Sequence, residues 1–206
     1  MNDIGEADRL YDLGKTEDLY AFLRKYLESN PRDGAALWRY ARACHDLSLL
    51  VSRTFLPLPL HLETLSTFHS FHFLFLFPFP KKKDKEEKKK LIYEAYDMAK
   101  KSIEYAPSDF AAHKWAGITL STVGDYEGSK VQIANAFIIR EHFDQAIALN
   151  SKDPTSRHLL GLWCFTFADM PWYMAKIAAA LFATPPTSSY QESLDHFVAG
   201  SIQIKY

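Results

Sequence analysis

The feature that most constrains the fold is the recurrence of helix-like segments between proline breaks. Pro107 and Pro154 mark such breaks 47 residues apart, and Pro31 precedes Pro107 by 76 residues. The difference of 29 residues is close to the length of the unusual stretch 51–80, so removing that stretch restores the interval. Units of two helices that repeat in this way stack into a solenoid. The sequence therefore predicts an α-solenoid of helix hairpins, with units longer than a standard tetratricopeptide repeat.

Apolar side chains recur at helical spacing along most of the chain, and no useful length of sequence alternates as a strand does. The last helix is expected to begin at a capping box, Ser189 to Glu192. A turn is expected at the glycine-bracketed stretch GDYEG, 124–128. The chain is thus predicted to be all-α, with helices over residues 16–29, 33–47, 85–105, 109–122, 129–149, 155–170 and 171–182, and a last one from 189.

Residues 68–90, FHSFHFLFLFPFPKKKDKEEKKK, change abruptly from apolar to charged. The uninterrupted apolar part, 73–77, is too short for a membrane span, which needs about 20 apolar residues. Phe, Leu, Ser and Pro are the residues encoded by codons that begin with two pyrimidines, and a polypyrimidine tract precedes a splice acceptor. We therefore interpret 51–83 as a low-complexity insertion, a translated intron, and expect a poorly ordered loop between two helices of one hairpin.

Charge and cysteine usage exclude several classes of protein. The chain has 24 basic and 25 acidic residues and a net charge of −1, which argues against a nucleic-acid binder. Cys44 and Cys164 are far apart and are expected to be buried, reduced thiols. The opening MNDIGEADRL lacks the features of a secretory signal, so a cytoplasmic protein with no transmembrane span is expected.

No pattern of catalytic residues is present. The sequence contains no GxSxG, P-loop or HExxH motif. His69 and His72 lie in the insertion without further ligands, and His113, His142 and His158 fall in helices at no metal-ligand spacing. We therefore expect no enzyme activity, no metal and no cofactor.

Specific motifs resemble the regulator of microtubule dynamics family: GDYEG, ANAFIIREHF, FADMPWY and LFATPP, all within 123–186. The resemblance covers roughly 1–50 and 84–197. It implies one tetratricopeptide-like domain formed by 1–50 and 84–199, interrupted by 51–83, with a divergent tail at 200–206. Because the family domain continues with further helices, we expect this one to be truncated at its C-terminus.

The resemblance also implies a function. Single-domain members are cytosolic proteins that bind microtubules and associate with spindle poles and mitochondria. A longer paralogue has an N-terminal membrane anchor, tethers mitochondria to the endoplasmic reticulum and handles phospholipids. We expect a microtubule-binding scaffold that affects microtubule dynamics and spindle organisation, and keep a phospholipid-binding or organelle-contact module as the alternative. Microtubule binding should fall steeply with ionic strength, whereas uptake of lipid into a groove should not.

A lysine-rich stretch offers a way to attract the acidic tails of tubulin. Residues 81–90 contain seven lysines and carry a net charge of +4. The alternative is a solvated loop followed by a first helical turn. Candidate contact residues are Lys85, Lys88, Lys89, Lys90, Lys100 and Lys101, with Lys114, Lys130 and Arg140 as secondary candidates.

A cluster of aromatic residues has two possible roles. Its members are Trp163, Phe165, Phe167, Trp172 and Tyr173. As structure, they would form the interlocking core of two helices around Pro171. As function, they would line an apolar groove for a lipid tail or a partner helix, on a face that the expected truncation leaves open.

Overall fold

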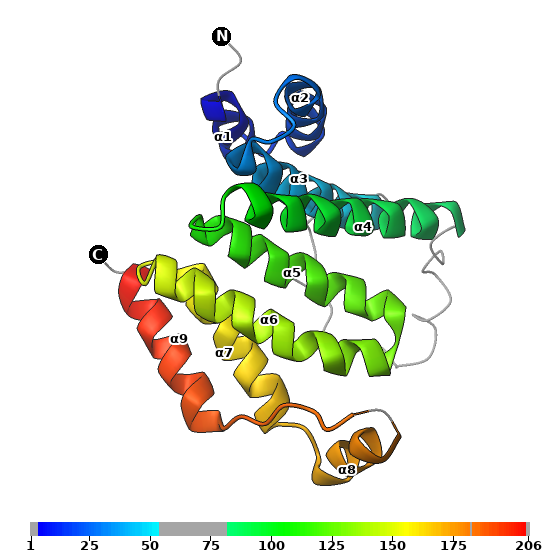
Figure 1. The fold of residues 1–206 in the computed structure, drawn as a ribbon, viewed down its shortest axis with the longest axis vertical. Helices are drawn as coiled ribbons and strands as arrows, with labels where there is room; N and C mark the ends of the chain where they lie inside the picture. Colours follow the sequence, from blue (N-terminus) through cyan, green and yellow to red (C-terminus); the bar gives the residue numbers. More distant parts are fainter. Residues whose placement is uncertain (1–3, 54–81, 182, 205–206) are drawn as a thin grey trace, which may run out of the picture.

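The computed structural model describes residues 4–53, 82–181 and 183–204 (Figure 1). Every regular element among these residues is a helix, which confirms the predicted all-α fold. The predicted poorly ordered loop within 51–83 falls mainly on residues 54–81, which lie outside the described residues. In chain order the helices are α1 (Ile4–Asp12), α2 (Thr16–Ser29), α3 (Gly34–Arg53), α4 (Lys82–Tyr105), α5 (Phe110–Glu127), α6 (Ser129–Leu149), α7 (Pro154–Ala168), α8 (Trp172–Leu181) and α9 (Tyr190–Ile204).

The helices pack as successive hairpins, as a solenoid requires. The most extensive packing joins α3 to α4, α5 to α6, and α7 to α9, while α4 on α5 and α6 on α7 join one hairpin to the next. Figure 1 shows these pairs following one another from α1 and α2 to α7 and α9. Helix α8 lies between α7 and α9 in the sequence but outside their pairing. The fold is therefore a tetratricopeptide-like array of helix hairpins.

The same turn precedes the first helix of three hairpins. The backbone N–H groups of Asp33, Asp109 and Asp153 donate to the carbonyl three residues earlier, over 3.2, 3.0 and 3.2 Å. Each aspartate then caps the following helix, by accepting from the N–H of Ala36, Ala111 or Ser156. Such side-chain caps satisfy helix-start amides that have no partner within the helix.

These turns correct the predicted repeat register. Pro31 and Pro107 lie in the turn two residues before the capping aspartate, whereas Pro154 is the first residue of α7. Pro154 is therefore not equivalent to Pro107, and the equivalent position is Ser151. The helices themselves begin at 34, 110 and 154, so the uninterrupted unit is 44 residues rather than 47.

The capping aspartates also connect one hairpin to the next. The indole Nε1–H of Trp38, in α3, donates to Asp109 Oδ2 over 2.9 Å. The ammonium of Lys114, in α5, lies 3.1 and 3.2 Å from the two carboxylate oxygens of Asp153. Trp38 and Lys114 each lie five residues after their own capping aspartate, so both contacts occur at the same repeat position. The cap of one hairpin is thus held by a side chain of the hairpin before it.

In each of two hairpins, a glycine allows the two paired helices to approach closely. A Cβ atom on Gly117 would lie 2.5 Å from the ring of Phe143, and one on Gly161 would lie 2.8 Å from the ring of Phe197. Both glycines stand eight residues after the capping aspartate of their helix. The aromatic rings of α6 and α9 therefore fill equivalent spaces against α5 and α7.

Several helix boundaries differ from the sequence prediction. Helix α5 runs to Glu127, so most of the GDYEG stretch is helical and only Gly128, with φ of 80°, turns the chain. Helix α1 was not predicted. Helix α3 continues to Arg53 and α4 begins at Lys82, inside the bounds proposed for the insertion. These extensions lengthen helices that already pack against a partner, and tertiary packing supplies most of a helix's stability.

The capping box at Ser189 is half confirmed. The Ser189 hydroxyl accepts from the Glu192 N–H over 3.1 Å, as predicted. The Glu192 carboxylate binds Ser188 and Arg140 rather than the backbone of Ser189. The buried state predicted for both cysteines is confirmed, and neither forms a disulfide.

Candidate functional site: a basic helix start and an apolar hollow

The lysines predicted to contact a partner all lie on α4, which runs across the middle of the array in Figure 1. Exposed side chains are those of Lys85, Lys89, Lys90, Lys100 and Lys101, while Lys88 is half-buried. One helix therefore presents all six, although they do not form a single uninterrupted basic stripe.

Two of these lysines are engaged within the chain. Lys89 Nζ lies 5.5 Å from the ring centroid of Tyr93 and 6.0 Å from that of Tyr126, so it helps to pack α4 on α5. Lys100 Nζ lies 2.9 Å from Asp97 Oδ1, and this hydrogen bond raises the pKa of Lys100. Lys85 and Lys90, together with the less exposed Lys88, are the better candidates for an outside contact.

The basic excess is confined to the start of α4. Residues 82–90 contain six lysines and three acidic residues, whereas residues 91–105 contain two lysines and three acidic residues. The fields of opposite charges a few ångströms apart on one helix largely cancel for a partner farther away. Salt screens what remains beyond the Debye length, about 8 Å at physiological salt. An acidic partner would therefore be attracted to the first turns of α4 rather than to the whole helix.

The secondary candidates separate into two kinds. Lys114 and Arg140 form ion pairs that join helices of this chain, Lys114 with Asp153 and Arg140 with Glu192. Lys130, at the start of α6, is exposed. Sequence alone could not tell these apart, because the acidic partners lie 39 and 52 residues away in the chain.

An apolar hollow of about 520 Å³ lies where α5, α6 and α7 meet. Its core side is formed by Leu120, Ile139, Phe143 and Trp163, which belong to the buried cluster of these helices. Polar side chains such as Ser121, Gln132 and Asn135 also border it. This is the arrangement of many small-molecule sites, a mostly apolar hollow with a few polar groups.

The predicted aromatic cluster does not stay together. Trp163 and Phe167 pack on each other, with ring centroids 4.6 Å apart, and both line the hollow. The Trp163 indole also donates to the Ala136 carbonyl over 3.0 Å. Phe165 faces away and packs on Tyr190. Trp172 and Tyr173 are 70% and 52% exposed, so the expectation of an interlocking core around Pro171 is wrong for these two.

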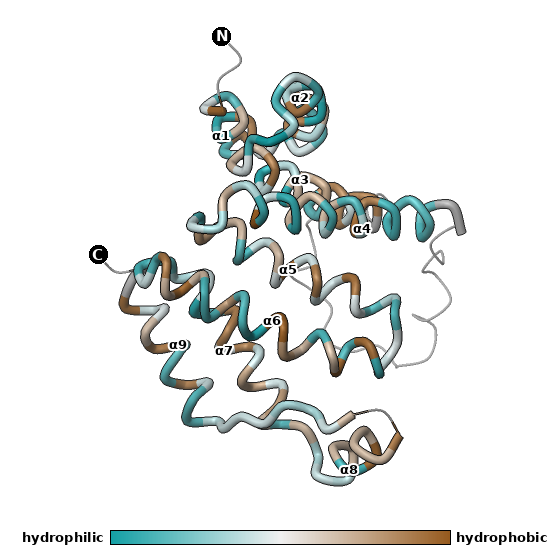
Figure 2. The backbone as a smooth tube through the Cα atoms, viewed as in Figure 1, coloured by the Kyte–Doolittle hydropathy of each residue, from teal (hydrophilic) through white to brown (hydrophobic). Residues whose placement is uncertain are grey.

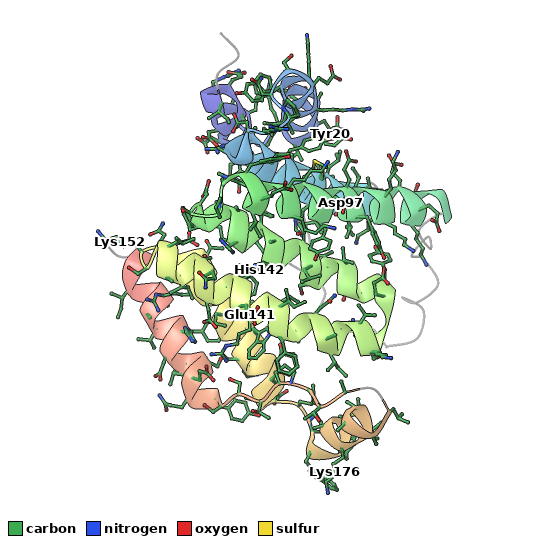
Figure 3. All side chains as sticks on the ribbon, viewed as in Figure 1. Tyr20, Asp97, Glu141, His142, Lys152 and Lys176 are labelled. Atoms are coloured by element: carbon green, nitrogen blue, oxygen red, sulfur yellow. The ribbon has the colours of Figure 1, made fainter. Side chains whose placement is uncertain are left out.

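Helix α8 is apolar and yet unburied. None of its residues is buried, and the exposed ones include Trp172, Met174, Ile177 and Leu181. Figure 2 shows it mostly in brown and tan at the far end of α7, and Figure 3 shows Lys176 projecting from it at the bottom of the view. Two prolines after it, Pro185 and Pro186, are buried and return the chain to α9.

Two histidines meet across the α5–α6 pair, although their positions in the sequence show no metal spacing. Nδ1 of His113 and Nδ1 of His142 are 3.4 Å apart. Burial, together with the nearby His113, lowers the pKa of His142 (labelled in Figure 3). The second ring nitrogen of His113 lies 3.0 Å from the Pro107 carbonyl, which suits a hydrogen-bonding role in the turn before α5.

A cluster around Arg42 connects α1 to α3 and was not recognised in the sequence. The Arg42 guanidinium lies 3.5 Å from the ring centroid of Tyr11 and 3.8 Å from Asp8. Arg39 binds the same Asp8 carboxylate through two hydrogen bonds of 2.8 and 2.7 Å. This cluster holds α1 in place and leaves its arginines directed inward.

No helix in the described part of the chain is both long enough and apolar enough to cross a membrane. The predicted absence of a span between 55 and 80 concerns residues outside that part.

The fold defines the class of protein, a tetratricopeptide-like helical-repeat protein. The family model described as regulator of microtubule dynamics protein 1-3 matches residues 74–200. Regulator of microtubule dynamics protein 1 of Mus musculus is 47% identical over 194 residues, 94% of this chain and 53% of the relative. The Pongo abelii protein of the same name is 48% identical over 192 residues, 93% of this chain and 51% of the relative.

This chain belongs to the regulator of microtubule dynamics family, as its motifs indicated. It spans about half the length of the curated relatives it matches. Regulator of microtubule dynamics protein 3 of Xenopus laevis is more distant, 30% identical over 111 residues, 54% of this chain and 24% of the relative. A thermophilic tetratricopeptide-repeat protein of Thermus thermophilus aligns with 98% of this chain and 97% of its own at 16% identity, with a TM-score of 0.37.

Proposed function

We propose that this chain is a non-enzymatic scaffold that binds microtubules through the start of α4. Membership of the regulator of microtubule dynamics family is the observation that carries the proposal. The basic excess over residues 82–90 supplies a physical means, because clustered lysines attract acidic segments over several ångströms. A cytoplasmic, cytoskeletal location with a role in spindle organisation and an association with mitochondria belongs to the same proposal.

The contact is assigned to Lys85, Lys88 and Lys90. These three stand in the basic part of α4, and none of them contacts the tyrosine pair that holds Lys89. Lys101 lies in the part of α4 where acidic residues outnumber the lysines, so its contribution is secondary. The same holds for Lys100, whose ammonium already binds Asp97.

The test is co-sedimentation with microtubules over a salt series. The variant carries Lys85→Gln, Lys88→Gln and Lys90→Gln, and a matched control carries Lys25→Gln, Lys152→Gln and Lys176→Gln, three exposed lysines that are not contact candidates. We expect at least tenfold weaker binding by the variant and little change in the control. Equal binding by all three proteins would remove the contact from α4.

The apolar hollow favours a second candidate function, the binding of a phospholipid acyl chain or another apolar ligand. Its volume of about 520 Å³ falls within the range of about 300–1,000 Å³ that ligand sites occupy. Lipid extraction from vesicles should then be insensitive to salt and should fall when Leu162, on the hollow, is changed to Glu. The control Leu194→Glu alters a similarly exposed leucine outside the hollow, 53% against 46% exposed. Equal extraction by both variants would exclude the hollow.

A further inference from the structure

Three metal-ligating side chains that neither candidate function uses lie together between α7 and α9. They are Cys164 of α7 and Glu192 and His196 of α9, and their ligand atoms all lie within 4.8 Å of one another. Cys164 is fully buried, while Glu192 and His196 are half-buried. Glu192 and His196 are four residues apart, so α9 presents both on one face.

Tight packing fixes the distance between the two helices at this point. The Ser193 hydroxyl, next to Glu192 in the chain, donates to the Gly161 carbonyl of α7 over 2.8 Å, and this hydrogen bond is buried. The Phe197 ring, next to His196, occupies the space that a side chain on Gly161 would fill. The three donors are therefore brought together by rigid helices rather than by a surface loop.

Neighbouring groups orient the Glu192 carboxylate. The Ser188 hydroxyl donates to Oε2 over 2.7 Å, and Arg140 Nη2 donates to Oε1 over 2.6 Å. Each carboxylate oxygen has two lone pairs, so one remains on each for a further ligand. Arg140 adds a positive charge beside the cluster, but its Nε also faces Asp144, 3.3 Å away, which offsets that charge.

We propose that Cys164, Glu192 and His196 form a binding site for a zinc ion. Thiolate, imidazole and carboxylate are the donors that zinc uses in proteins, and three protein ligands leave a fourth position for water. Magnesium and calcium prefer sites made of oxygen alone, so the buried sulfur selects against them. On binding, the thiol of Cys164 loses its proton to solvent, and sulfur, imidazole nitrogen and carboxylate oxygen each donate an electron pair to the ion. The ion clamps α7 to α9, because its ligands come from both.

Cobalt(II) provides a direct test, because a thiolate ligand produces a charge-transfer absorption band that oxygen and nitrogen ligands do not. The reduced chain is titrated with cobalt chloride, and zinc chloride is then added. We expect a charge-transfer band that saturates at one ion per chain and disappears when zinc displaces cobalt. Thermal unfolding with one equivalent of zinc should show a raised Tm, since a ligand that binds only the folded state stabilises it.

Matched variants separate this site from adventitious binding. Cys164→Ser should abolish the band, and His196→Gln, at a half-buried position, should weaken cobalt binding at least tenfold. Cys44→Ser changes the other buried cysteine, and His158→Gln changes a histidine that also packs against α9 through Phe197; both should bind as the unaltered chain does. Absence of the band in the unaltered chain would overturn the proposal. So would equal cobalt affinity in the folded His196→Gln variant.

Discussion

Replacing Asp153 by alanine should show whether a capping aspartate also connects successive hairpins. In the structure the Asp153 Oδ2 atom accepts from the Ser156 N–H over 2.8 Å and from the Ser156 hydroxyl over 2.5 Å. The same carboxylate binds the ammonium of Lys114, and the two side chains are only 11% and 14% exposed. Asp153→Ala therefore removes the cap of α7 and leaves a nearly buried positive charge without its partner.

The expected loss of stability follows from these two contributions. Removing an aspartate cap costs about 1 kcal/mol. Breaking a buried ion pair from one side costs about 3–5 kcal/mol when the remaining charge is fully buried. Lys114 keeps some exposure and the ring of Phe110 at 5.0 Å, so about 2 kcal/mol is appropriate for this part. Asp153→Ala should lower the free energy of unfolding by about 3 kcal/mol.

Urea unfolding of a double-mutant cycle provides the assay. The proteins are the unaltered chain, Asp153→Ala, Lys114→Met and the double variant. Because Lys114→Met removes the charge that Asp153→Ala strands, the double variant should be more stable than the sum of the single effects predicts, by at least 1 kcal/mol. Additivity within about 0.5 kcal/mol would show that Asp153 acts only as a cap and would refute the connection between hairpins.

Three further results are expected from other parts of the array. Gly117→Ala should lower the free energy of unfolding by about 1–2 kcal/mol in a urea titration, because the new Cβ would lie 2.5 Å from the Phe143 ring, and an unchanged value would contradict the close approach. Burial and His113 hold the pKa of His142 below its unfolded value of about 6.5. The unfolded chain therefore binds more protons than the folded chain at acidic pH. As a result, His142 makes the protein less stable as pH falls below about 6.5. His142→Gln should reduce the loss of stability between pH 7.5 and 5.5, and an identical loss would contradict this origin. Trp172→Ser should leave the urea midpoint unchanged while lowering the binding of a hydrophobic dye, because Trp172 is 70% exposed; a lower midpoint would show that α8 packs on the array.

The helical class and most helix positions could be predicted because apolar spacing and capping residues are local signals. Helix α6 begins and ends at the predicted residues, and Asp109 caps α5 as expected. The error in the repeat register arose because Pro154 and Pro107 look alike in the sequence. Proline is tolerated both in a turn and at the first position of a helix, so only the hydrogen bonds of the turn distinguish the two.

The functional surfaces were less predictable because they depend on distant partners. Lys100 and Lys114 are both lysines in helices, but one binds a neighbour on its own helix and the other an aspartate of the next hairpin. Aromatic residues near Pro171 were expected to pack together, and the turn at Pro171 instead separates Trp172 from the hollow that Trp163 lines. The proposed metal cluster was missed because Cys164 lies 28 residues before Glu192 in the chain and on a different helix from Glu192 and His196.

The most direct test of the account is binding of this chain to microtubules with and without their acidic carboxy-terminal tails. Co-sedimentation at low salt is measured for intact microtubules and for microtubules whose tails have been cleaved, and circular dichroism confirms that the chain is folded. The basic start of α4 predicts saturable binding to intact microtubules and at least tenfold weaker binding once the tails are gone. Equal binding to both, or none to either, would contradict the claim that α4 recognises microtubules by charge.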